Sequence, residues 1–130
     1  MSERFILPPY ARSLGIFIAG DDGGVPLVAC DAAEHILGRP GFWHGGVIGS
    51  LLETAALGAA AATPKAKGKL LRIANLTVQF TRGGGMERLF ALGRVERAGR
   101  RLLNLRAEAW QQDRARPVAT ATMNVMLLDR

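Results

Sequence analysis

The chain has 130 residues, 48% of them hydrophobic and 22% charged, and this length and composition predict one globular domain over residues 1–130. Its apolar runs are shorter than the roughly 18–20 residues that cross a membrane, it begins without a signal-peptide pattern, and its one cysteine cannot form an internal disulfide, so we expect a cytoplasmic protein with no membrane partner. The net charge of +6 comes mostly from arginine and indicates an anionic partner.

The first half of the chain predicts a hairpin and one long helix. Residues 1–11 contain two adjacent prolines and predict an extended or short helical lead-in. Apolar runs at 14–19 and 25–32 flank the turn sequence Gly-Asp-Asp-Gly-Gly, which indicates a β-hairpin. Residues 45–62 then predict a mostly apolar helix that stops before Pro64.

Four more strands are predicted after the helix. Polar and apolar residues alternate over 75–81, as in a half-buried strand, and three glycines at 83–85 end it. Further strands follow at about 88–97, 101–112 and 118–127. A long apolar helix against about six antiparallel strands buries its whole surface only if the sheet curls round it. The expected fold class is therefore α+β, with a curved antiparallel sheet wrapped around a central helix, although a generic α+β sandwich fits the same pattern nearly as well.

Glu53 is the single charged residue of the predicted helix. A buried carboxylate without a partner is costly, so it is expected either to do chemistry or to have a partner such as an arginine. Burial would also raise its pKa toward neutral pH. Gly45 and Gly46 begin the same helix, where backbone N–H groups can polarise a carbonyl or hold an anion. The alternative for these glycines is a tight turn without a ligand.

The run from residue 38 to 46, Gly-Arg-Pro-Gly-Phe-Trp-His-Gly-Gly, precedes an acidic residue nine positions after the histidine. This pattern resembles the hotdog-fold acyl-CoA thioesterases of the phenylacetate-degradation branch. The resemblance implies a hotdog fold and an acyl-CoA substrate, with Glu53 as general base or nucleophile and the N–H groups of Gly45 and its neighbour Gly46 polarising the carbonyl. It also implies sites made between subunits, and hence a homodimer or a homotetramer. A thioester is already activated, so no cofactor is expected beyond the coenzyme A of the substrate itself.

The expected substrate-binding residues are Trp43, His44, Phe80 and Arg82. The histidine could approach the substrate or hydrogen-bond its own loop, and the aromatic residues could line an acyl pocket or pack in the core. By resemblance, the arginine could contact the pantetheine arm or the phosphates. A denser group of arginines surrounds one predicted hairpin, where a solvated basic face is the alternative to coenzyme A binding: Arg94, Arg97, Arg100, Arg101 and Arg106.

Two positions depart from the family pattern. Many relatives carry Asn, Gln or His six residues before the motif histidine, and this chain has Gly38; Arg39 or His35 could compensate. Some relatives carry Ser or Thr one turn after the carboxylate, and this chain has Leu57. These differences leave open a catalytically weak or silent acyl-CoA-binding protein.

Other functions are poorly supported by the sequence. Two histidines and one cysteine without a second cluster do not predict a metal site. The hotdog hydratases carry a short motif that contains Asp, Asn and Pro, and this chain has no such motif. The strands also lack the exposed aromatic residues that stack on bases, so we expect no nucleic-acid partner. The acyl group, and delivery by coenzyme A or by an acyl-carrier protein, stay open.

Overall fold

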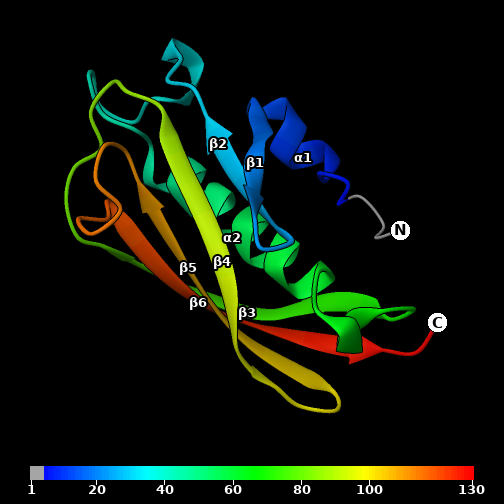
Figure 1. Ribbon diagram of the computed structural model, residues 1–130. Helices are drawn as coiled ribbons and strands as arrows, with labels where there is room; N and C mark the ends of the chain where they lie inside the picture. Colours follow the sequence, from blue (N-terminus) through cyan, green and yellow to red (C-terminus); the bar gives the residue numbers. More distant parts are fainter. Residues whose placement is uncertain (1–4) are drawn as a thin grey trace.

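A six-stranded antiparallel sheet curves around one long helix (Figure 1). The computed structural model describes residues 5–130. The strands lie in the order β1-β2-β4-β5-β6-β3, so β1 and β3 are the edges. In chain order the elements are α1 (Pro9–Ser13), β1 (Ile16–Asp22), β2 (Val25–Cys30), the 3-10 turn η1 (Glu34–Ile36), α2 (Gly45–Ala61), the 3-10 turn η2 (Pro64–Ala66), β3 (Leu70–Phe80), β4 (Leu89–Ala98), β5 (Leu102–Trp110) and β6 (Ala119–Leu128). The expected fold class is confirmed.

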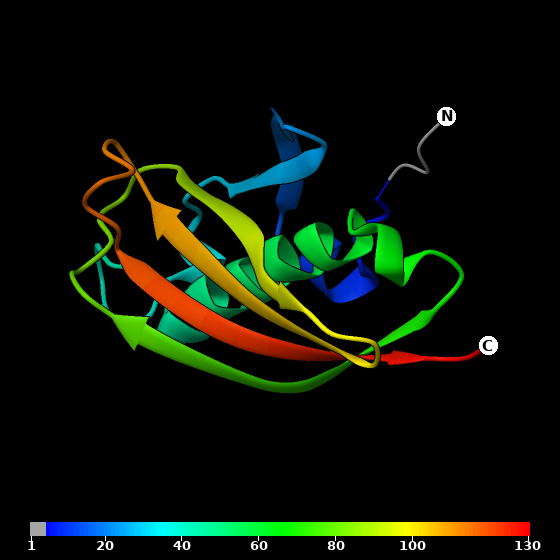
Figure 2. The same cartoon turned by 60° about the horizontal axis from the view of Figure 1, so that its bottom comes forward.

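Helix α2 lies in the hollow of the curved sheet, as Figure 2 shows. Its apolar residues are buried on most sides, and Leu51, Leu52 and Ala55 are fully enclosed. The helix ends one residue earlier than predicted, since Ala62 caps it and Pro64 cannot continue the backbone hydrogen bonds. Within residues 5–130 no helix is long and apolar enough to cross a membrane.

The helix and the sheet approach closely because the residues between them are small. A Cβ at Gly93 of β4 would lie 2.5 Å from the Ala55 carbonyl oxygen and 2.8 Å from the Ala56 Cα. The backbone of β4 therefore rests directly on the backbone of α2. Farther across the sheet, the inward residues of β5 and β6 complete the core in strict alternation, with Leu103 and Val125 among them.

The first hairpin is tighter than predicted. β1 continues through Asp22, and a two-residue turn of Gly23 and Gly24 joins it to Val25. Both glycines have positive φ, 59° and 93°, which the two-residue hairpin turns favour. In the predicted lead-in, Pro8 is the N-cap of α1 and Pro9 is its first residue, and the first four residues of that lead-in lie outside the described residues.

Strand β3 starts at Leu70, about five residues before its predicted start. It pairs with β6 along its length, from Leu70 opposite Leu128 to Phe80 opposite Ala119. The register shifts between Ile73 and Asn75, which marks a bulge. A bulge breaks the period of two, so the alternation could not be followed through it from the sequence.

Candidate functional site

A tight turn before α2 builds one side of the site. Residues Arg39-Pro40-Gly41-Phe42 form a β-turn closed by the Phe42 N–H, which donates to the Arg39 carbonyl at 3.0 Å. Proline at the second position and a glycine with φ of 83° at the third are the requirements of a type II turn. The turn brings its first and fourth side chains together, and the Arg39 guanidinium lies 4.2 Å from the centroid of the Phe42 ring.

Trp43 fastens this turn to the loop between β3 and β4. Its backbone N–H donates to the Gly84 carbonyl at 3.1 Å, and its indole Nε1–H donates to the Glu87 carbonyl at 3.1 Å. The ring is only 5% exposed. A Cβ at Gly84 would come within 3.2 Å of it, so the loop can lie flat against the indole only where the side chain is absent.

The helix start leaves one N–H group free rather than two. His44 is the N-cap, and its Nδ1 accepts a hydrogen bond from the Gly46 N–H at 2.8 Å. The Gly46 N–H, which we also predicted to donate to substrate, is therefore occupied in this structure, because the imidazole folds back onto it. The Gly45 N–H has no hydrogen-bond partner among the described residues. Of the two alternatives for His44, the structure shows the bond to its own helix start.

Phe80, the last residue of β3, stands against this helix start. A Cβ at Gly45 would lie 3.2 Å from the Cζ of the Phe80 ring. Phe80 as a whole residue is 57% exposed. A side chain at position 45 would therefore push against the Phe80 ring.

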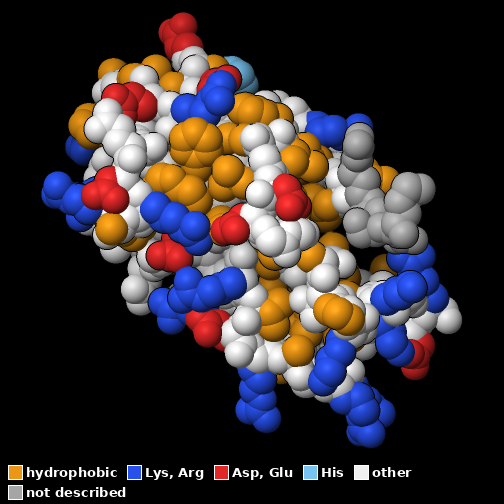
Figure 3. Space-filling model, in the orientation of Figure 1, with side chains coloured by type: hydrophobic (Ala, Val, Ile, Leu, Met, Phe, Trp, Pro, Cys, Tyr) orange, Lys and Arg blue, Asp and Glu red, His pale blue; other side chains and the backbone are white. Residues whose placement is uncertain are grey.

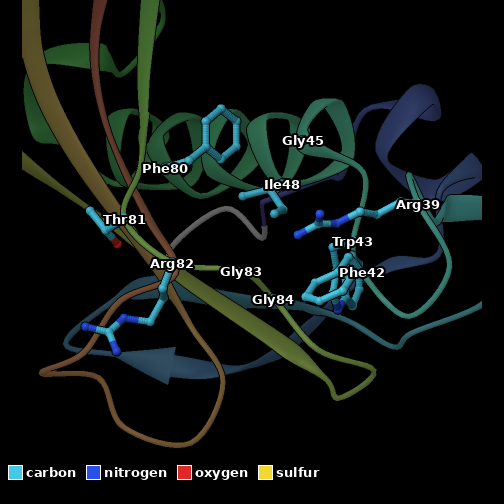
Figure 4. A pocket seen from close by; sticks show the side chains of 10 residues that line it. All are labelled: Arg39, Phe42, Trp43, Gly45, Ile48, Phe80, Thr81, Arg82, Gly83 and Gly84. Carbon is cyan, nitrogen blue, oxygen red and sulfur yellow. The ribbon is translucent and has the colours of Figure 1, made fainter.

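These groups surround a cavity of about 330 Å³ at the N-terminal end of α2 (Figure 4). The lining residues are Arg39, Phe42, Trp43, Gly45, Ile48, Phe80, Thr81, Arg82, Gly83 and Gly84. The cavity therefore gathers four of the predicted site residues, while the two others near it, His44 and Gly46, do not line it. The sequence analysis did not single out Ile48 or Thr81. An apolar residue in the first turn of a helix and a threonine just after a strand carry no local signal that they line a cavity.

The two arginines of the cavity differ in direction. Figure 4 shows the Arg39 guanidinium reaching toward Ile48 and Phe42, whereas the Arg82 side chain turns away. The Arg82 Nε donates to the Pro117 carbonyl at 3.2 Å, which explains its direction. The cation that reaches in is thus Arg39, which the sequence suggested only as a replacement for a missing side chain.

Glu53 lies farther along α2 and does not line the cavity. It is eight residues after Gly45, or about 12 Å at the helical rise of 1.5 Å per residue. It belongs to a half-buried stripe of the helix with Gly49 and Leu57. A Cβ at Gly49 would lie 3.8 Å from Val78, so the stripe faces the region beside edge strand β3.

The Glu53 carboxylate has no cation within 4.0 Å in residues 5–130. Burial raises its pKa above the ordinary glutamate value. Glu53 is therefore not paired with an arginine of its own chain within residues 5–130, which was the alternative to a catalytic role. A half-buried carboxylate with a raised pKa is suited to accept a proton near neutral pH.

The departure at Gly38 has a structural cause. A Cβ at this position would lie 3.2 Å from the His44 Cα, so a side chain here would push against the residue that caps α2. His35, the other suggested replacement, lies in η1 and does not line the cavity. Leu57 is half-buried on the same stripe as Glu53 and offers no hydrogen bond.

The arginines of the β4–β5 hairpin do not reach the cavity. Arg94 pairs with Glu96 and Glu108 at 3.1 and 2.9 Å, and Arg106 lies 3.7 Å from Glu96. The other three lie near the hairpin turn, where Figure 3 shows Lys and Arg side chains gathered at the lower end of the face. The structure favours the solvated basic face for this group. No cluster of three metal-ligating side chains occurs in the part of the chain that the structure describes.

Comparison with known proteins gives one family and many similar structures. Residues 40–118 match the family model described as "Thioesterase superfamily". A phenylacetic acid degradation-related protein from Ralstonia eutropha is 29% identical, with a TM-score of 0.77 over 94% of this chain and 92% of that chain. A conserved protein from Pseudomonas aeruginosa is 26% identical, with a TM-score of 0.80 over 94% and 95%. A thioesterase from Haemophilus influenzae shares the fold at 14% identity, with a TM-score of 0.84 over 98% and 94%. Curated protein sequences give no match.

Proposed function

The chain belongs to the thioesterase superfamily, and from that premise we propose that it hydrolyses acyl-CoA thioesters to a free acid and coenzyme A, with Glu53 as the catalytic carboxylate. One observation carries the assignment. Glu53 is the only ionisable side chain of α2, burial raises its pKa, and no cation of the described chain neutralises it. A structural carboxylate in this position would be expected to have a partner.

The Gly45 N–H is the proposed oxyanion donor. It is unbonded among the described residues, it stands at the positive end of α2, and it lines the cavity. A donor aimed at the developing oxyanion contributes about 10²–10³-fold to the rate in other acyl-transfer enzymes. Glu53 then acts either as the general base on a water molecule or as the nucleophile on the carbonyl carbon. Both roles require the ionised carboxylate.

We further propose that a second copy of the chain completes each site. The thioester carbonyl must lie within about 3 Å of the N–H donor and reach the carboxylate directly or through one water molecule, yet Gly45 and Glu53 of one helix are about 12 Å apart. β3 is an edge strand of 11 residues, and exposed edges of this length invite pairing. Two copies joined antiparallel along β3 would place their helices side by side in opposite directions. Glu53 of one copy would then face Gly45 of the other in a twofold dimer.

The primary test measures thiol release from short, medium, long and aryl acyl-CoAs. Glu53→Gln should lower kcat by about 10²-fold or more, because it removes the base or nucleophile and keeps the shape. Glu96→Gln, a carboxylate variant on the outer face of β4, is the matched control and should behave as wild type. Unchanged turnover in Glu53→Gln would refute the assignment. Acyl-CoA binding without turnover by the wild type would instead support the silent binding protein that Gly38 and Leu57 leave open.

Mixing two inactive variants tests the shared site. Glu53→Gln lacks the carboxylate, and Gly45→Pro lacks the N–H, since proline is accepted at the first position of a helix but has no backbone donor. In a mixed dimer of shared sites, one of the two sites combines an intact Glu53 with an intact Gly45. Activity should therefore return after the two variants are unfolded and refolded together. A site built within one chain would stay inactive in every mixture.

A further inference from the structure

Arg39 places a positive charge inside the cavity that holds the proposed oxyanion donor. Its guanidinium stands over the Phe42 ring at 4.2 Å and points toward Ile48 in Figure 4. Among the described residues no carboxylate lies within 4.0 Å of it. The donors along the edge of the guanidinium are therefore free to bind an anion.

The local backbone holds this group in place. The type II turn at Pro40 and Gly41 fixes Arg39 beside Phe42. The Phe42 ring also contacts the loop after β3, since a Cβ at Gly83 would lie 3.2 Å from it. A guanidinium stacked on an aromatic ring loses less freedom on binding a ligand than one that moves in solvent.

The other residues that line the cavity favour a ligand with an apolar body and a negative charge at one end. No Asp or Glu lines the cavity, while Trp43 and Ile48 are 5% and 3% exposed and form apolar walls. A carboxylate between such walls would bind the guanidinium through two parallel hydrogen bonds. An acyl chain that ends in a methyl group would cover Arg39 and offer its donors nothing in return.

We propose that Arg39 binds a carboxylate at the far end of the acyl group, so that the preferred substrates are monothioesters of dicarboxylic acids with coenzyme A. The inference rests on the proposed function. The phosphates of coenzyme A are the other anions of such a substrate, but the whole pantetheine arm separates them from the sulfur. Arg39 and the Gly45 N–H, on which the thioester carbonyl rests, line one cavity of about 330 Å³. The group within reach of Arg39 is therefore the acyl end.

A binding experiment tests the inference without requiring turnover. The probes are two thioethers that cannot be hydrolysed, S-(5-carboxypentyl)-CoA and S-hexyl-CoA, which differ only in a terminal carboxylate or methyl group. By calorimetry, the wild type should bind the carboxylate probe about 10- to 100-fold more tightly. Arg39→Gln should abolish this difference, Arg39→Lys should restore part of it, and Arg100→Gln, at the remote hairpin turn, should leave it unchanged. Equal affinity of the wild type for both probes would overturn the proposal. An equal loss of affinity for both probes in Arg39→Gln would also overturn it, because that result indicates that Arg39 contacts a phosphate of coenzyme A.

Turnover separates this inference from the proposed function. With adipoyl-CoA and hexanoyl-CoA, the wild type should show a kcat/KM ratio in favour of adipoyl-CoA, and Arg39→Gln should reverse or equalise it. Hydrolysis of both at equal rates would refute the dicarboxylate preference and leave the thioesterase assignment standing. Tighter binding of the carboxylate probe with no hydrolysis of any thioester would refute the thioesterase assignment and leave the role of Arg39 standing.

Discussion

Replacing Gly93 with alanine should test whether the close approach of β4 to α2 positions the site. The added Cβ would lie 2.5 Å from the Ala55 carbonyl oxygen and 2.8 Å from the Ala56 Cα. An ordinary contact is at about 3.4 Å, so strand and helix must separate by roughly 0.9 Å. Both obstructing atoms belong to the backbone of a buried helix, so no side-chain rotation can relieve the clash.

The expected cost follows from this geometry. Overpacking a tight core costs about 1–3 kcal/mol, and the backbone contact favours the upper end. Removing a glycine from a strand recovers about 0.5–1 kcal/mol. The net loss in the free energy of unfolding is then about 2–2.5 kcal/mol. With an unfolding entropy of about 2.1 cal/mol/K per residue, this corresponds to a fall in Tm of about 7–9 °C for a chain of 130 residues.

Scanning calorimetry measures the fall, and Gly20→Ala in β1 is the matched control. A Cβ at Gly20 would meet only the end of the Leu27 side chain, at 3.7 Å, so its Tm should not fall and should rise by up to about 4 °C from the glycine term alone. Well below its Tm, Gly93→Ala should also lose turnover, since Glu53 lies only two to three residues before the displaced backbone. A Tm for Gly93→Ala within about 2 °C of the wild type would show that the helix yields freely and would refute the argument.

Two further predictions concern the ends of the candidate site. His44→Ala should lower the free energy of unfolding by about 0.5–2 kcal/mol in urea titrations, because it removes the acceptor that caps the Gly46 N–H. His44→Asn should keep most of this free energy, since asparagine also caps helices, and equal losses in the two variants would exclude a capping role. For Glu53, the raised pKa means that the folded state keeps the proton to higher pH than the unfolded chain, so its contribution to stability falls as pH rises through the interval between the two pKa values. Glu53→Gln should therefore gain Tm relative to the wild type as pH rises above the ordinary glutamate pKa of about 4.3, and a Tm difference that is constant with pH would contradict the raised pKa.

Local patterns were sufficient for most of the fold. The ends of α2 follow from a cap, a glycine pair and Pro64, which act on neighbouring backbone groups. The strands β4, β5 and β6 follow from alternation within each segment, and their observed limits lie within about two residues of those predicted. The start of β3 could not be predicted, because the bulge between Ile73 and Asn75 depends on pairing with β6, a strand about fifty residues away.

In the candidate site, too, the sequence indicated some residues, whereas the hydrogen bonds that their atoms make depend on the fold. The motif singled out Glu53 and Gly45, and the sequence named Arg39 only as a possible replacement for the side chain missing at Gly38. Nothing local predicted that the His44 imidazole would occupy the Gly46 N–H or that Arg82 would turn to the Pro117 carbonyl. Each N–H bonds whichever acceptor the fold brings to it.

The sequence by itself determined which segments become helix and strand and which carboxylate and glycines stand out, because periodicity, turn chemistry and isolated charge are properties of neighbouring residues. Only the tertiary structure decided which groups share a cavity. It placed Gly45, Arg39 and Phe80 together from a helix start, a turn and a strand end, and left Glu53 about two turns away beside an edge strand. The reason is physical: distance between segments and competition for hydrogen bonds are set by packing, which no single stretch of sequence contains.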